Sequence, residues 1–87
     1  MHNWLKNEIT KLMEKQNKSI TDIKIKEKPI DNGFILIINI DFTDIDSGSL
    51  RSEDIIVPVY TKIDSFKDIL NNIENQINYV IKKEEIA

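Results

Sequence analysis

The dipeptide Asn32-Gly33, which lies between two runs rich in β-branched residues, is the feature that most constrains the fold. Asn-Gly is typical of a two-residue type I′ turn, which joins two antiparallel strands and fixes their register. Such a turn places Asp31 opposite Phe34. Counting outward then predicts the pairs Ile30–Ile35, Lys28–Ile37, Lys26–Asn39, Ile25–Ile40, Lys24–Asp41 and Ile23–Phe42. The sequence therefore predicts a hairpin of strands at about residues 21–29 and 34–43.

The second of these strands alternates apolar side chains with other residues. Its alternate positions are Phe34, Leu36, Ile38, Ile40 and Phe42. Because successive side chains of a strand point to opposite faces of the sheet, these five belong to one face. In the expected register Ile23 and Ile25 join them, whereas Lys24 faces the other way. We therefore expect one apolar face that another layer must cover, with Glu27 as its one misfit.

A third strand is expected at about residues 54–61, after a polar stretch with Ser47-Gly48-Ser49 at its tip. Pro58 interrupts this strand. Proline has no backbone N–H to donate within a sheet, so it predicts a strand at the edge. Short connections then favour a three-stranded antiparallel meander of order 1-2-3 with the second strand in the centre.

Helices are expected at both ends of the chain, at about residues 3–16 and 65–83. Apolar residues recur at helical spacing in each; those of the first are Leu5, Ile9, Leu12 and Met13, and those of the second are Phe66, Ile69, Leu70, Ile73, Ile77, Val80 and Ile81. Asn17 is suited to a left-handed residue that ends the first helix. Ser65 and Asp68 form a candidate capping box for the second.

These elements predict an α+β fold, a two-layer α-β-β-β-α sandwich with both helices on one face of the sheet. Residues 1–87 are expected to form a single domain. Five positions of the last helix also step by four and three residues, as in a coiled coil. Such a stripe equally covers a sheet, which is the interpretation we favour. Trp4 is expected at the rim of the core.

The composition disfavours several functions. A net charge of −3 is unlike the strongly basic surface of a dedicated nucleic-acid binder. The chain has no cysteine, which excludes disulfides, zinc–thiolate sites and thiol catalysis. Its only histidine is His2, and its two glycines are too far apart for a phosphate loop. We therefore expect a protein that is not an enzyme and needs no cofactor. Without a signal-like or membrane-spanning segment, it is expected in the cytoplasm.

An acidic group near the second loop raises one alternative, a calcium site. Its members are Asp41, Asp44, Asp46, Glu53 and Asp54. Asp44, Asp46 and Gly48 have the spacing that begins a calcium-binding loop, but the expected bidentate glutamate is replaced by Ile55. A solvated loop with turn-forming residues is the favoured interpretation, and no metal ligand is assigned.

The sheet face turned away from the helices offers the best candidate for function. It is predicted to combine lysines with apolar side chains, as an interaction surface does; the partner-binding candidates are Lys24, Lys26, Lys28, Ile35, Ile37, Ile56 and Tyr60. The first hypothesis is a small protein-binding or regulatory module that forms a homodimer or binds a protein partner there. The alternative is nucleic-acid binding by the three lysines. Abundant isoleucine, lysine and asparagine further suggest an accessory or inhibitor protein of a phage or mobile element.

Overall fold

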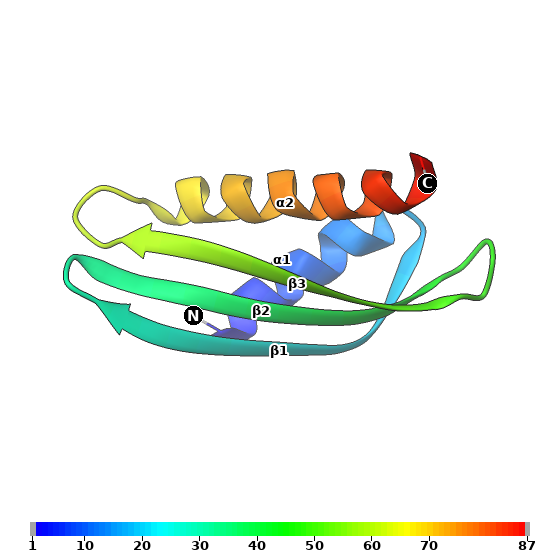
Figure 1. Cartoon of the computed structure of the whole chain (residues 1–87), viewed down its shortest axis with the longest axis horizontal. Coiled ribbons are helices and arrows are strands. Elements are labelled where there is room, and N and C mark those ends of the chain that lie inside the picture. The colour runs from blue at the N-terminus through cyan, green and yellow to red at the C-terminus, as the bar shows by residue number, and fades with distance from the viewer. Residues whose placement is uncertain (1, 87) are drawn as a thin grey trace.

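The computed structural model describes residues 2–86, with side chains as far as Lys83. Along the chain, one helix precedes the three strands and one follows them. Figure 1 shows both helices on the same side of the sheet. The elements are α1 (His2–Glu14), β1 (Lys18–Ile30), β2 (Gly33–Asp44), β3 (Leu50–Tyr60) and α2 (Phe66–Ile86). The sheet is antiparallel with the order β1-β2-β3. The predicted α+β class and the central position of β2 are confirmed.

The core lies between the helices and one face of the sheet. Its buried side chains come from all five elements, and they are Leu5, Ile9, Met13, Ile23, Leu36, Ile38, Ile40, Phe42, Ile55, Val57, Val59, Ile69, Ile73, Ile77 and Ile81. On β2 the alternation is strict, because Leu36, Ile38, Ile40 and Phe42 are at most 1% exposed. We call this helix-covered side the inner face, and the opposite side the outer face.

The predicted hairpin register was wrong by two positions. Ile30 pairs with Gly33, Ile25 with Ile38 and Ile23 with Ile40, so the loop is Asp31-Asn32 instead of Asn32-Gly33. Neither loop residue has a positive φ, so the turn is not type I′. A bulge at Thr21 shifts the register once more. Because an error of two positions preserves the alternation, each side chain still faces the predicted side.

Gly33 is needed for close approach and not for a positive φ. A Cβ atom built on Gly33 would overlap the carbonyl oxygen of Val59 on the neighbouring strand. Beside it, the carbonyl oxygen of Asn32 accepts a hydrogen bond of 3.1 Å from the backbone N–H of Thr61. The hairpin therefore closes where β2 can lie tightly against β3.

The helix ends follow the predicted capping chemistry. Asn17 has a φ of 62° and ends α1 in the left-handed conformation. At the start of α2, the backbone N–H of Ser65 donates to Asp68 Oδ2 (3.0 Å), and the backbone N–H of Asp68 donates to Ser65 Oγ (3.2 Å). The backbone N–H and the hydroxyl of Ser65 both donate to the Asp68 carboxylate, and these two hydrogen bonds lower the pKa of that carboxyl.

The buried stripe of α2 is narrower than predicted. It steps by four residues through Ile69, Ile73, Ile77 and Ile81, all at most 5% exposed. Phe66 was expected within it but is 64% exposed. The stripe faces the sheet, and no described helix of this chain is long and apolar enough to cross a membrane.

β1 and β3 begin earlier than predicted, and charged residues form ion pairs along the added segments. Lys18, only 4% exposed, pairs with Asp44 across the sheet, with 3.1 Å between Nζ and Oδ2. Arg51 lies over the ring of Phe42 and forms an ion pair of 3.1 Å with Glu53. These charged residues belong to the parts of β1 and β3 that lie near the β2–β3 loop.

We predict that Gly33→Ala lowers the free energy of unfolding by about 2 to 3 kcal/mol, near the upper end for single substitutions, because two backbones must separate. Gly48→Ala is the control. Gly48 has a φ of 72° with nothing near its missing Cβ, so its cost is only about 1 kcal/mol of backbone strain. Urea unfolding measures both. Equal losses would contradict the close approach at Gly33.

The ion pair of Asp44 should appear in the pH dependence of stability. The hydrogen bond from Lys18 holds the pKa of Asp44 below its ordinary value of 3.8. A lowered folded-state pKa contributes stability above the ordinary pKa, and this contribution is lost as pH falls through the folded-state pKa. Asp44→Asn should therefore lower stability at pH 7 and flatten its decline below about pH 4. Asp31→Asn, at the exposed hairpin turn, should leave the pH profile unchanged in thermal melts.

Candidate protein-interaction face

The outer face is a three-stranded surface whose cross-strand rows follow from the register. Its side chains alternate with the buried ones, so each row carries one residue from β1, β2 and β3 in that order. From the β1–β2 hairpin inward, the rows are Ile30–Gly33–Tyr60, Lys28–Ile35–Pro58, Lys26–Ile37–Ile56, Lys24–Asn39–Asp54 and Asp22–Asp41–Ser52. All seven predicted partner-binding candidates lie on this face.

An apolar block occupies the part of this face formed by β2 and β3. We call it the outer-face patch and define it by its members Ile35, Ile37, Ile56, Pro58 and Tyr60. Ile37 is 36% exposed, Ile56 59% and Tyr60 42%, whereas Ile35 is half-buried among its neighbours. The predicted outward orientation of Tyr60 and the edge position of Pro58 are confirmed.

A row of lysines borders the patch along β1. Lys24, Lys26 and Lys28 are exposed, and none of the three forms an ion pair within the described part of the chain. The register places Lys26 beside Ile37 and Lys28 beside Ile35. Their aliphatic stems can cover the edge of the patch while their ammonium groups stay in water.

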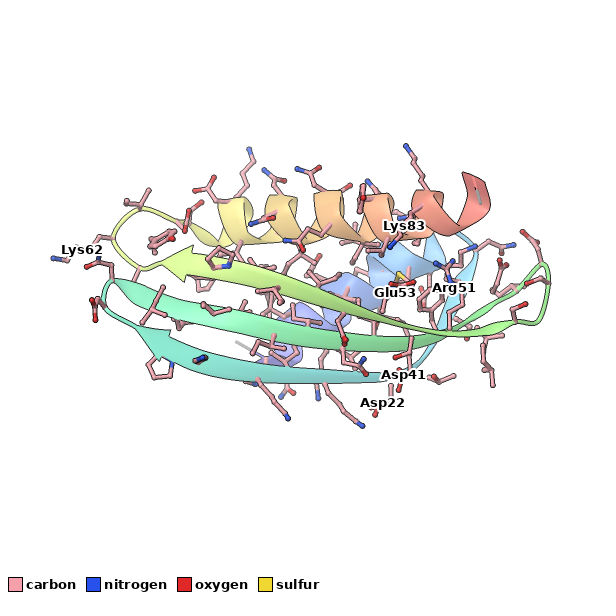
Figure 2. All side chains as sticks on the ribbon, viewed as in Figure 1. Asp22, Asp41, Arg51, Glu53, Lys62 and Lys83 are labelled. Carbon is pink, nitrogen blue, oxygen red and sulfur yellow. The ribbon has the colours of Figure 1, made fainter. Side chains whose placement is uncertain are left out.

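Carboxylates gather at the opposite end of the outer face. Asp22 and Asp41 are directly paired across β1 and β2, as Figure 2 shows. Like charges in such a pair repel each other and destabilise the sheet locally. The expected pairing of Lys24 with Asp41 was wrong, since Lys24 lies opposite Asn39. Asn39 Nδ2 donates to Asp54 Oδ1 at 2.8 Å, which brings Asp54 into the same surface.

The predicted acidic group does not come together at one place. Asp41 and Asp54 lie on the outer face, whereas Glu53 pairs with Arg51 near the end of α2. Asp44 contacts Lys18, and Asp46 Oδ1 accepts a hydrogen bond of 2.6 Å from Asn17. Among the described side chains, no three acidic or histidine residues are placed to hold a metal ion.

The free edge of β3 is partly covered by the chain itself. Gln76 of α2 donates to the carbonyl oxygen of Ile56 at 2.9 Å, so this carbonyl points away from β2. By alternation Pro58, which lacks an N–H, faces the same edge. The backbone N–H of Tyr60 donates to Asp64 at 2.8 Å. Between Ile56 and Tyr60 this edge therefore has fewer groups left to pair with another strand.

A second apolar surface lies at the start of both helices. Trp4 packs against Phe66 with 5.5 Å between ring centroids, so Trp4 lies at the core rim as expected. Phe34, Val59 and Ile69 line a shallow hollow of about 480 Å³ beside Phe66. The sequence analysis did not predict this surface, because it assigned Phe66 to the buried stripe of the last helix.

Sequence reasoning missed two charged residues of the outer face, Asp22 and Asp54. Asp54 was grouped with the loop because the third strand was expected to begin there, whereas β3 begins at Leu50. Continuing the alternation backward from Pro58 and Ile56 would have placed Asp54 on this face. His2 Nε2 lies 2.9 Å from Glu27 Oε1, and this contact joins α1 to β1.

Comparisons with known proteins do not assign this fold to a family. No protein-family model, curated protein or solved structure matches the chain. We therefore infer function from the physical properties of the outer face.

Proposed function

We propose that this protein is a small, non-enzymatic interaction module that associates with a second copy of itself through the outer-face patch. The observation that carries this proposal is the contiguous apolar block on the sheet face that neither described helix covers. Removing apolar surface from water is favourable by about 25 cal/mol per Å², so a complementary surface that covers these side chains gains affinity. A partly exposed antiparallel sheet tolerates single apolar residues, but this block joins two adjacent strands.

The surrounding charges favour contact between faces over contact between sheet edges. β1 is an edge strand of 13 residues, long enough to pair with another chain. Lys24, Lys26 and Lys28 project beside this edge, and lysines on edge strands oppose strand addition. At β3, Gln76 and Pro58 restrict the other edge. Association is therefore directed to the outer face.

Nucleic-acid binding by the lysine row receives less support from the same surface. Asp22 lies on β1 next to the lysines, and Asp41 and Asp54 occupy adjoining rows of the face. These carboxylates would repel phosphate groups that approach the lysines. The hypothesis of a phage or mobile-element accessory protein rests on composition alone.

Substitution of Ile37 tests the proposal, because Ile37 is central in the outer-face patch. Ile37→Lys should raise the dissociation constant of the dimer by roughly 30-fold or more, the effect of losing about 2 kcal/mol at a central interface residue. Tyr60→Asp, at the border of the patch, should weaken the dimer less. Size-exclusion chromatography with light scattering over a range of concentrations measures the change.

Ile45→Lys provides the matched control. Ile45 is 57% exposed and belongs to the β2–β3 loop instead of the patch, so its substitution should leave the dissociation constant unchanged. Dissociation of all three variants to the same extent would contradict a role specific to the outer-face patch. A wild-type protein that stays monomeric at every concentration would overturn the proposal.

A further inference from the structure

We propose that the two copies pack outer face against outer face about a twofold axis parallel to β2, so that Lys24 of each copy contacts Asp54 of the other. This inference rests on the proposed function and specifies its geometry. It follows from the residue types that each strand carries on the outer face. β1 carries lysines, β2 carries isoleucines, and β3 carries isoleucine, proline and aspartate, as the cross-strand rows show.

A twofold axis along β2 places β1 of one copy over β3 of the other. Each row then meets the same row in reverse order, as the self-complementary surface of a twofold dimer requires. In the central row, Ile37 meets Ile37 of the second copy and Lys26 covers Ile56. In the next row Lys24 meets Asp54, and this contact occurs twice. Ile35 and Ile37 thus meet their own counterparts, the stems of the lysines cover Ile56 and Pro58, and each Lys24 meets an opposite charge.

The alternative twofold axis lies across the strands and is less favourable. It places β1 over β1 of the second copy. If this axis crosses the middle of the outer-face patch, Lys26 lies against Lys28 of the second copy. If it crosses one row farther from the β1–β2 hairpin, Lys24 lies against Lys26. Like charges brought together at an interface weaken association, so the lysine row selects against this orientation.

Lys24 and Asp54 are available for such a contact. Lys24 is exposed and forms no ion pair with any described residue. Asp54 is also exposed, and its Oδ1 accepts the hydrogen bond from Asn39 that orients the carboxylate. Sheets that pack face to face lie about 10 Å apart, a gap that a lysine can span from one face to the other. In the last row, Asp41 of one copy faces Asp41 of the other. The twist of the two sheets separates these two carboxylates.

Charge reversal at one residue should break this contact, and the opposite reversal at its partner should restore it. Lys24→Asp places Asp opposite Asp54 at both contacts of a homodimer, and Asp54→Lys places lysine opposite Lys24. Each variant should raise the homodimer dissociation constant by roughly tenfold to a hundredfold, as expected when two opposite-charge contacts become two repulsive ones. Mixing the two variants pairs Asp with Lys at both contacts. The mixture should therefore form a heterodimer with nearly wild-type affinity, measured by sedimentation equilibrium.

Lys62→Asp and Glu14→Lys serve as matched controls. They change the net charge by the same amounts, but Lys62 lies in the β3–α2 loop at one end of the molecule and Glu14 ends α1. Neither should alter the dissociation constant. Thermal melting of each variant shows whether it folds, and heterodimer formation in the mixture requires two folded chains.

Four results would overturn the proposed geometry. Homodimers of Lys24→Asp and Asp54→Lys as tight as wild type would show that the residues do not meet, as would a mixture that stays monomeric. If Ile37→Lys dissociates the dimer while the charge reversals have no effect, the outer face is the interface but the axis is wrong. If the wild-type protein is a monomer, the proposed function and this geometry both fail.

Thiol cross-linking with a short bismaleimide gives an independent measurement, because the chain contains no cysteine of its own. Ile37→Cys should be joined into a covalent dimer, since each Ile37 faces its own counterpart near the axis across a gap of about 10 Å. Lys26→Cys alone should not cross-link, but it should do so when mixed with Ile56→Cys. Rapid cross-linking of Lys26→Cys alone would instead place β1 beside β1 of the second copy and overturn the proposed axis.

Discussion

The structure depends on burial of the alternate side chains of β2. Leu36, Ile38, Ile40 and Phe42 all point toward the helices, and the core forms around them. A shift of one residue in this strand would expose the whole set. This constraint fixes which side of β1 and β3 faces the helices, and it also determines which residues remain on the outer face.

The outer face is therefore a consequence of the core. Ile35 and Ile37 lie between buried residues of β2, so they face away from both described helices. Lysines on β1 and carboxylates beyond them leave the patch as the only strongly apolar part of the cross-strand rows. In the proposed dimer a second copy covers this surface, because its charges occur in the complementary order. Specificity would come from the lysines, which disfavour both edge pairing and the opposite orientation.

Much of the fold could be predicted from the sequence, because alternation and helical periodicity each repeat over many residues. The sides faced by Ile25, Ile37 and Tyr60 needed only the period of a strand. The register needed the turn type, and that inference failed because Gly33 serves a close contact with Val59 that lies 26 residues away in sequence. Such long-range contacts leave no local pattern. The buried position of Lys18 was missed for the same reason, since its partner Asp44 belongs to another strand.

Isoleucine methyl NMR tests the central claim most directly, because 18 isoleucines report on both faces of the sheet at once. In a dilution series, the δ1 methyl signals of Ile37 and Ile56 should move with protein concentration. Those of buried Ile38, Ile55 and Ile73 should stay nearly constant. Concentration-dependent shifts confined to Ile63, in the loop that precedes Phe66, or no shifts at all would contradict association through the outer face.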